Sequence, residues 1–247
     1  MGKFVINGGK KLYGEVDIQS AKNAMLPLIA STVLLDFEVA FLNAPKLRDV
    51  IVMLEIIKEL GGKYRFEGTT LFVDCSNVRK SEIPKELSSQ IRASVFITGG
   101  VLSRLKRVEF YASGGCDIGS RPIDMHLSGL ESLGAKLSLG ENNLVLTCDK
   151  IIGKEITLKC KSVGVTENLI ITAVLGEGVT VIKNCAKEPE IVCLADFLNG
   201  LGAKIKGAGT SVIQIEGVKK LAEHKRFFMP ISDRIEVGTF ILGALTT

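Results

Sequence analysis

The feature that most constrains the fold is a short phrase that occurs three times in the chain. Leu60-Gly61-Gly62-Lys63 returns as Leu133-Gly134-Ala135-Lys136 and again as Leu201-Gly202-Ala203-Lys204. Before each copy, apolar residues recur at three- and four-residue spacing, which indicates an amphipathic helix that ends at the glycine. Because self-similarity of this kind reflects one structural unit used several times, we expect three equivalent units.

The sequence around each phrase predicts the same order of elements in every unit. Two short strands joined by a polar turn follow each Leu-Gly helix, whereas another strand and a more apolar helix precede it. Each unit thus reads strand, helix, strand, helix, strand, strand. The expected Leu-Gly helices are 47–60, 123–133 and 191–201, the apolar helices are 22–35, 92–105 and 167–175, and the strands include 38–42, 70–75, 108–111, 143–148, 179–183 and 211–216.

A single unit would leave one face of its helices and of its sheet exposed, so several units must share a core. We therefore expect an α/β, inside-out repeat domain in which three units surround a pseudo-threefold axis, with apolar helices inside and sheets outside. A fourth unit begins at residues 233–240, in the place that Lys22, Arg92 and Thr166 hold in their units. Because the chain stops at Thr247, before the next strand, we expect it to be truncated. The alternative is that the last helix closes the domain.

Composition excludes several classes of protein. The chain is 46% hydrophobic and 23% charged with a net charge of +4, which is typical of a globular protein and does not indicate a polyanion-binding surface. No apolar run reaches the ~18 residues of a membrane span, and the first residues show no signal-peptide pattern. Two histidines and six scattered cysteines argue against a histidine-rich metal centre, a Ser-His-Asp triad and a disulfide framework. We expect a cytoplasmic protein with reduced thiols and without nucleic-acid or membrane partners.

A glycine-rich segment, residues 113–122, joins a predicted strand to a predicted helix and carries Cys116 at its centre. Pro122 suits the first turn of that helix, and Arg121 together with the positive helix end would attract an anion. A thiol in such a place is a nucleophile of lowered pKa or a proton donor, depending on its distance from the positive charge. The alternative is a flexible surface loop with an incidental cysteine, and the residues alone leave both interpretations open.

Cations recur where the predicted helices begin. Three cations, Lys22, Arg92 and Arg234, occupy equivalent positions in their units, and Asn23 follows the first of them. Positive charge at a helix start opposes the helix macrodipole, so these positions are unexpected for helix stability alone. One such residue would be explained structurally, but three indicate a shared anion-binding cleft. The polar turn at residues 162–164 could add backbone N–H groups for a phosphate or sugar.

Other polar residues have simpler explanations. We expect His126 to be a solvated or partly buried surface residue. Glu188 and Glu190 begin a predicted helix, where carboxylates complement the dipole, so a structural role is sufficient.

Together these motifs resemble those of the UDP-N-acetylglucosamine enolpyruvyl transferases, a family of peptidoglycan synthesis. The cysteine loop followed by Arg-Pro-x-Asp is the most specific motif, and the likeness spans essentially the whole chain. The related shikimate-pathway transferase shares the repeat fold but lacks this loop and the Lys-Asn pair. The matching segments are 20–24, 43–47, 92–94, 114–124, 162–164, 188–192 and 233–240.

The resemblance implies a reaction. An enolpyruvyl group moves from phosphoenolpyruvate to the 3′-hydroxyl of UDP-N-acetylglucosamine, and phosphate is released, in the first committed step of peptidoglycan synthesis. The sugar oxygen attacks C2 of the enol ester, C3 is protonated, and the tetrahedral intermediate then eliminates phosphate. Such chemistry requires cations for the phosphate and carboxylate, an acid near C3 and a base for the hydroxyl. No metal or organic cofactor is implied.

The resemblance also implies roles for individual residues. Cys116 and Lys22 would be catalytic: the thiol as the acid that can also form an adduct with phosphoenolpyruvate, and the ammonium group as a cation for that substrate, beside Arg92 and Arg121. Asn23 would contact the reacting centre and the sugar. The nucleotide-sugar side would be formed by Arg121, Pro122, Ile123, Asp124, Met125, Lys161, Ser162, Val163 and Gly164.

Family members are longer than this chain. They have two domains of three units each, of which residues 22–229 would form one complete domain and residues 1–21 and 230–247 parts of the other. The aspartate base and further arginines for phosphoenolpyruvate belong to the second domain, so we expect little or no activity from this chain alone. The alternatives are a non-catalytic nucleotide-sugar-binding fragment, a scaffold that associates through its unfinished C-terminal end, and another enolpyruvyl transferase such as the shikimate-pathway enzyme.

Two local departures from the family pattern stand out. Cys160 occupies the place of a basic residue, and Lys161 follows it. Ser20 replaces the glycine before Ala-Lys-Asn, which is tolerable if the backbone there has a negative φ.

Overall fold

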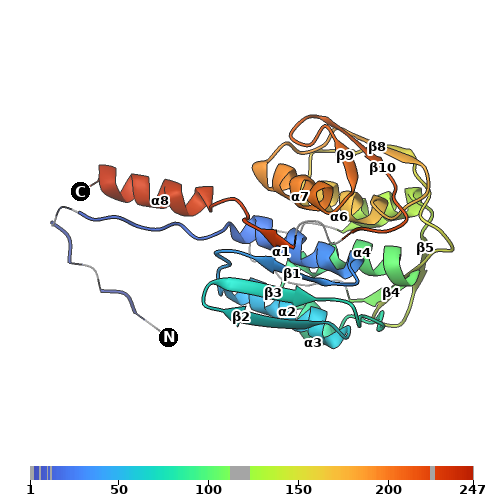
Figure 1. Ribbon diagram of the computed structural model, residues 1–247, viewed down its shortest axis with the longest axis horizontal. Coiled ribbons are helices and arrows are strands. Elements are labelled where there is room, and N and C mark those ends of the chain that lie inside the picture. Colours follow the sequence, from blue (N-terminus) through green and yellow to red (C-terminus); the bar gives the residue numbers. More distant parts are fainter. Residues whose placement is uncertain are drawn as a thin grey trace.

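A computed structural model describes residues 3–5, 7–9, 11, 13–111, 123–222 and 226–246 of the chain. Three separate sheets lie around a central group of helices (Figure 1). The first has the order β11 (Phe227–Phe228), β1 (Glu38–Phe41), β3 (Thr70–Asp74), β2 (Lys63–Glu67); the second β4 (Arg107–Phe110), β6 (Leu144–Thr147), β5 (Lys136–Leu139); and the third β7 (Glu155–Thr157), β8 (Val179–Lys183), β10 (Val212–Glu216), β9 (Lys204–Lys206). Each sheet corresponds to one repeat unit, as the sequence predicts.

The first sheet is completed by a strand from the far end of the chain. β11 pairs with β1 in parallel, with Ala40 opposite Phe227, just as β7 pairs with β8 in parallel in the third sheet. Residues 13–19, which precede the first unit, form no strand. The outer strand of the first unit therefore comes from residues 227–228, so the chain returns to its starting unit before it continues.

The repeat extends to backbone conformation at the ends of equivalent strands. Asn43 follows β1 and Asn184 follows β8, and their φ angles are 52° and 60°. Each donates a hydrogen bond from its side-chain Nδ2 to a carbonyl just before the apolar helix of its unit, Ile18 at 3.1 Å and Leu158 at 2.9 Å. Asparagine tolerates this left-handed conformation better than most residues, which explains its use at both places.

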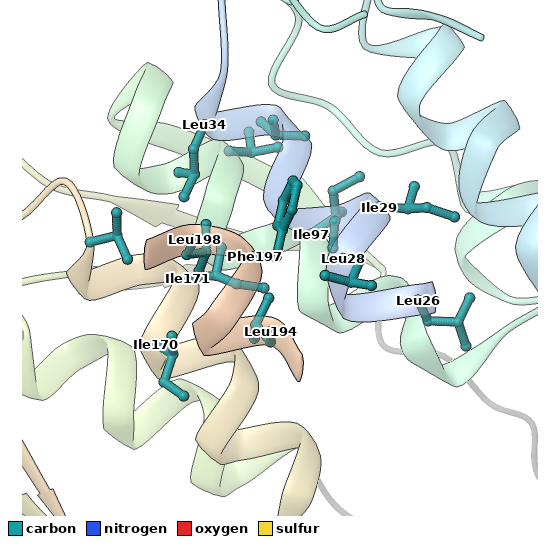
Figure 2. Close-up of a cluster of buried hydrophobic side chains, with 14 of the residues drawn as sticks. Leu26, Leu28, Ile29, Leu34, Ile97, Ile170, Ile171, Leu194, Phe197 and Leu198 are labelled. Atoms are coloured by element: carbon teal, nitrogen blue, oxygen red, sulfur yellow. The ribbon is translucent and has the colours of Figure 1, made fainter. Parts of the chain in front are cut away.

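The apolar helices form the interior, as expected. They are α1 (Lys22–Ser31) with the 3-10 turn η1 (Thr32–Leu34), α4 (Val95–Leu105) preceded by the 3-10 turn η2 (Arg92–Ser94), and α6 (Val163–Ala173). Figure 2 shows their side chains, among them Leu28, Ile97 and Ile171, packed with Phe197 of α7 (Pro189–Gly200). A Cβ at Gly99 would lie 2.2 Å from Thr172 Oγ1, so α4 and α6 approach each other only because this residue is glycine.

The amphipathic helices end where the repeated glycines predict. α2 (Arg48–Glu59), α5 (Asp124–Ser132) and α7 stop just before Gly61, Gly134 and Gly202, all of which have positive φ. A short helix, α3 (Lys85–Ser88), lies between β3 and η2.

The third apolar helix begins earlier than predicted. α6 starts at Val163 rather than at 167, because the Ser162 side chain accepts a hydrogen bond from the Val165 N–H at 3.4 Å and caps the helix. Thr166, which the repeat placed at a helix start, is therefore buried inside α6. The replacement of the family's glycine by Ser20, by contrast, is tolerable as expected, because Ser20 is not among the residues with positive φ.

The last helix, α8 (Arg234–Leu245), extends away from the body of the molecule, on the same side as the N-terminal segment (Figure 1). Asp233 caps it by accepting hydrogen bonds from the N–H groups of Ile235 and Glu236. None of its residues is buried, and Ile241, Leu242 and other apolar side chains are exposed. No helix in the described residues is long and apolar enough to cross a membrane.

Candidate functional site

A cleft of about 1240 Å³ opens where the amino-terminal ends of several helices meet. Its lining comes from the starts of α1, α5, α6, α7 and α8 and from η2. The first N–H groups of a helix have no intrahelical acceptor and carry the positive end of its dipole, so converging helix starts favour anions. Lys22, Arg92, Lys161 and Arg234 add positive charge to the same lining. The cations that the repeat places at helix starts therefore share one cleft.

Lys22 is the first residue of α1, and the first turn of that helix contains no acidic residue. Its Nζ lies 2.9 Å from Oδ2 of Asp49 at the start of α2. Both side chains are more than a third exposed, so the pair contributes at most about 1 kcal/mol and leaves the ammonium group available to a bound anion. Asn23 lines the cleft beside it.

The start of α6 is shaped by close packing on α4. A Cβ at Gly164 would lie 2.6 Å from Cε1 of Phe96, so only glycine lets the backbone lie this close to the ring. Lys161 precedes this turn, whereas Cys160 is exposed with its Sγ 3.5 Å from Sδ of Met125. The N–H groups of the first turn of α6 thus lie between a cation and an apolar wall.

His126 belongs to this wall and not to the outer surface. It is 4% exposed, and its Nδ1 lies 3.2 Å from Nδ2 of Asn168. The Asn168 Oδ1 accepts a hydrogen bond from the Gly99 N–H, so the amide nitrogen faces the imidazole and donates to Nδ1. Burial, aided by the charge of Arg92, lowers the pKa of His126 to about 4. The residue is therefore a neutral imidazole with its proton on Nε2, and the prediction of a solvated or partly buried surface position is wrong.

One side of the cleft is acidic. Glu190, in the first turn of α7, is 3% exposed and pairs with Arg234 of α8, with Oε1 3.0 Å from Nε. Glu167 on α6 is 1% exposed, and its Oε1 has no hydrogen-bond partner among the described residues. Burial, with the nearby charges of Glu190 and Glu188, raises the pKa of Glu167 well above its usual value. In the described part of the chain, no group of three or more histidine, cysteine, aspartate or glutamate side chains is arranged to hold a metal ion.

Most of the predicted site residues meet in this cleft. Ile123 does not line it: it precedes α5 and packs against the core instead. Cys116, Arg121 and Pro122 lie outside the described residues. The predicted residues that line the cleft are Lys22, Asn23, Arg92, Asp124, Met125, Lys161, Ser162, Val163 and Gly164.

Sequence reasoning did not identify Glu167 and His126 as members of the site. For Glu167 a signal existed, since it is a charged residue in an otherwise apolar helix. For His126 no local signal existed, because its burial results from the packing of α5 on α6. Glu188 and Glu190, explained above by the helix dipole, also line the cleft.

Comparison with known proteins agrees with this geometry. The family model for EPSP synthase (3-phosphoshikimate 1-carboxyvinyltransferase) matches residues 6–247. The chain belongs to the EPSP synthase family. Within this family it is 47% identical over 247 residues to UDP-N-acetylglucosamine 1-carboxyvinyltransferase 2 of Caldanaerobacter subterraneus, and 43% identical over 247 residues to UDP-N-acetylglucosamine 1-carboxyvinyltransferase of Desulfatibacillum aliphaticivorans. The alignments cover all of this chain and 59% of either relative.

Two solved structures of transferases share the fold. The enolpyruvyl transferase NikO from Streptomyces tendae matches 96% of this chain with a TM-score of 0.81 at 22% identity. EPSP synthase from Acinetobacter baumannii matches 96% with a TM-score of 0.75 at 16% identity. The chain covers 56% and 54% of these two structures. The expected enolpyruvyl transferase repeat fold is thereby confirmed.

Proposed function

We propose that this chain forms the wall of a UDP-N-acetylglucosamine enolpyruvyl transferase that binds both substrates, in the cytoplasmic synthesis of peptidoglycan precursors. The observation that carries the proposal is the convergence of several helix starts, with Lys22, Arg92 and Lys161, on one cleft. Both substrates are anions, phosphoenolpyruvate through its phosphate and carboxylate and the nucleotide sugar through its diphosphate. Helix starts and cations are the groups that bind such anions.

Phosphoenolpyruvate would bind where α1 and η2 begin. Lys22 and Arg92 would hold its charged groups, with Arg121 added by the resemblance. In the transfer, the 3′-oxygen forms a bond to C2, its proton passes to a base, and an acid delivers a proton to C3. Loss of a proton from C3 and cleavage of the bond between C2 and the phosphate oxygen then restore the C2–C3 double bond, which gives the enol ether product and free phosphate. We assign the C3 acid to Cys116 from its motif.

The nucleotide would bind where α5 and α6 begin. The first-turn N–H groups of α6 and the Lys161 ammonium group suit the diphosphate, while Asp124 and Met125 supply the neighbouring wall. Lys159, Cys160 and Lys161 all line the cleft at this turn, and the Cys160 thiol contacts Met125, so Lys159 and Lys161 are the cations that face the diphosphate there.

We infer further that residues 22–229 form one complete repeat domain and that residues 1–21 and 230–247 belong to a second one. The return of β11 to the first sheet and the departure of α8 from the body support this division. The chain spans 59% of the length of its curated relatives. By resemblance, the base for the sugar hydroxyl lies in the second domain, so we expect substrate binding without turnover from this chain alone.

Binding and turnover separate the candidate functions. Isothermal titration calorimetry of the 247-residue chain should detect UDP-N-acetylglucosamine, and an assay of phosphate release with both substrates should detect no turnover. Shikimate 3-phosphate serves as the control ligand, because the family model also describes the shikimate-pathway enzyme. Binding of that control in preference to the nucleotide sugar would contradict the proposal, and turnover equal to that of a full-length relative would contradict the division into domains.

The exposed apolar surface of α8 is the place where we expect a further protein surface to pack. Ile241, Leu242 and Leu245 are all exposed there, and water contact with large apolar side chains is unfavourable. Analytical ultracentrifugation of the chain with and without residues 230–247 tests whether this surface also joins two copies. If the chain sediments as a monomer both with and without these residues, self-association through α8 is excluded.

A further inference from the structure

Glu167 is the one buried side chain in the described residues with an oxygen or nitrogen atom that lacks a hydrogen-bond partner. It lies one turn beyond the start of α6, is 1% exposed, and nevertheless lines the cleft. A buried polar atom without a hydrogen-bond partner is unfavourable, so such an atom in a folded protein calls for an explanation. A ligand group that enters the cleft and meets Oε1 would remove this cost.

The charges around Glu167 decide what kind of group this can be. The charges of Glu190, in the first turn of α7, and of Glu188, just before that helix, act on Glu167, and the Arg234 guanidinium is paired with Glu190. Burial and these two carboxylates favour the neutral form of Glu167. An anionic group would be repelled from a corner that contains these carboxylates, whereas a hydroxyl or an amide could both donate to and accept from a neutral carboxyl group.

The position of Glu167 relative to the proposed diphosphate site indicates which part of the nucleotide sugar it faces. Asn168, the next residue of α6, faces α4 and α5 through Gly99 and His126. Successive residues of a helix point about 100° apart, so Glu167 turns from that wall toward α7. The α7 side also packs on α1, which carries Asn23 at its start. Glu167 is therefore on the side where the sugar would lie if the diphosphate lies at the start of α6.

We propose that Glu167 is a binding residue for the sugar, with its unpartnered Oε1 in a hydrogen bond to a hydroxyl or to the acetamido group of N-acetylglucosamine. The assignment rests on the proposed function, since it requires a nucleotide sugar in the cleft. It adds a specificity role: a buried carboxyl group beside two carboxylates accepts an uncharged sugar and disfavours a sugar that carries a negative group at the same position.

The test compares two ligands and two substitutions in the 247-residue chain by calorimetry. Glu167→Met removes the hydrogen-bonding atoms at similar volume, and Glu167→Gln keeps an uncharged donor and acceptor. UDP-N-acetylglucosamine contains the sugar, and UDP lacks it. We expect Glu167→Met to weaken UDP-N-acetylglucosamine binding by about 3- to 10-fold, the effect of one neutral hydrogen bond, and to leave UDP binding unchanged. Glu167→Gln should bind both ligands within about 2-fold of the unsubstituted chain.

Controls make each outcome decisive. Glu177→Met removes an exposed carboxylate that pairs with Lys150 and should change neither affinity. Should Glu167→Met fail to unfold cooperatively, the smaller Glu167→Ala replaces it with the same expectations. Unchanged UDP-N-acetylglucosamine binding in the variant, or an equal loss for UDP, would overturn the assignment to the sugar. Failure of the unsubstituted chain to bind either ligand would instead overturn the proposed function.

Discussion

The guanidinium Nε of Arg234 lies 3.0 Å from Oε1 of Glu190, and this ion pair joins the first residue of α8 to the first turn of α7. The carboxylate is almost fully buried, whereas about half of the arginine side chain is exposed. Because α8 has no buried residue of its own, the pair helps to fix the place where this helix leaves the body. The ion pair also keeps the positive charge of Arg234 beside the acidic side of the cleft.

Removal of Arg234 should therefore destabilise the chain through the carboxylate that remains. Arg234→Met leaves Glu190 buried without its partner, which we expect to lower the free energy of unfolding by about 1–3 kcal/mol, less than for a fully buried pair because the arginine is half exposed. The double variant Arg234→Met with Glu190→Met should recover most of this loss. Urea denaturation measures the free energy of unfolding of both variants. The control is Lys150→Met, which removes the exposed ion pair between Lys150 and Glu177. Equal small effects for Arg234→Met and the control would contradict the prediction.

His126 should make stability depend on pH below neutrality. Its pKa is lowered from 6.5 to about 4 in the folded chain, so the unfolded chain binds the proton more tightly. The contribution is therefore fully present above pH 6.5 and is lost as the pH falls toward 4, by about 3 kcal/mol in total. Urea denaturation across this range should show a steeper loss for the unsubstituted chain than for His126→Gln.

The comparison with His126→Gln isolates this one group. Glu167, with a raised pKa, acts in the opposite sense, because its folded form holds the proton more tightly and loses stability as the pH rises above 4.5. It is present in both proteins and cancels in their difference. Parallel pH profiles for the two proteins would show that His126 accepts a proton in the folded state without cost.

Gly164 should be intolerant of any side chain. The added Cβ of Gly164→Ala would lie 2.6 Å from Cε1 of Phe96, so the ring or the start of α6 must move. We expect a loss of about 1–3 kcal/mol in the free energy of unfolding together with weaker UDP binding. Gly238→Ala is the matched control, since a Cβ there meets nothing within 4 Å and alanine favours a helix. Thermal unfolding that ranks Gly164→Ala at or above Gly238→Ala would contradict this account.

The sequence predicts the fold well where a signal is local and repeated. β8 has the predicted bounds, and the three glycines end their helices because positive φ is a requirement of the residue itself. Apolar periodicity alone predicts that α6 starts at 167, four residues late, because the Ser162 side chain caps the helix before the periodicity begins. The pairing of β11 with β1 joins residues far apart in the chain through a strand of two residues, which no local pattern reveals.

In the candidate site, too, the features with a local, repeated signal could be predicted, and those that depend on long-range packing are harder to predict. Lys22, Arg92 and Arg234 could be predicted to meet because repeat symmetry places equivalent helix starts together. His126 could not, because its burial is produced by α5 packing on α6. For Glu167 the sequence offers one signal, a charged residue in a mostly apolar helix, but its burial results from α7 packing on α6. Local sequence therefore identifies the cations of the cleft, and tertiary packing supplies its neutral and acidic groups.

Lys22 should be dispensable for folding and important for binding. Its exposed pair with Asp49 contributes at most about 1 kcal/mol, so Lys22→Met should leave the free energy of unfolding nearly unchanged. Loss of a charge-assisted hydrogen bond to an anion should weaken phosphoenolpyruvate binding by about 10-fold or more. Calorimetry with phosphoenolpyruvate, in the presence of saturating UDP-N-acetylglucosamine, measures this.

Two further variants decide whether the position or the charge of Lys22 matters. Lys22→Arg keeps the charge with a different shape and should bind with intermediate affinity. Lys58→Met removes a more exposed cation, with a side chain 60% exposed against 39% for Lys22, that pairs with Glu55 on α2 and does not line the cleft. The affinity of this variant should therefore equal that of the unsubstituted chain. If Lys22→Met and Lys58→Met bind phosphoenolpyruvate equally well, the start of α1 does not bind the anion, and the site for this substrate must lie elsewhere in the cleft.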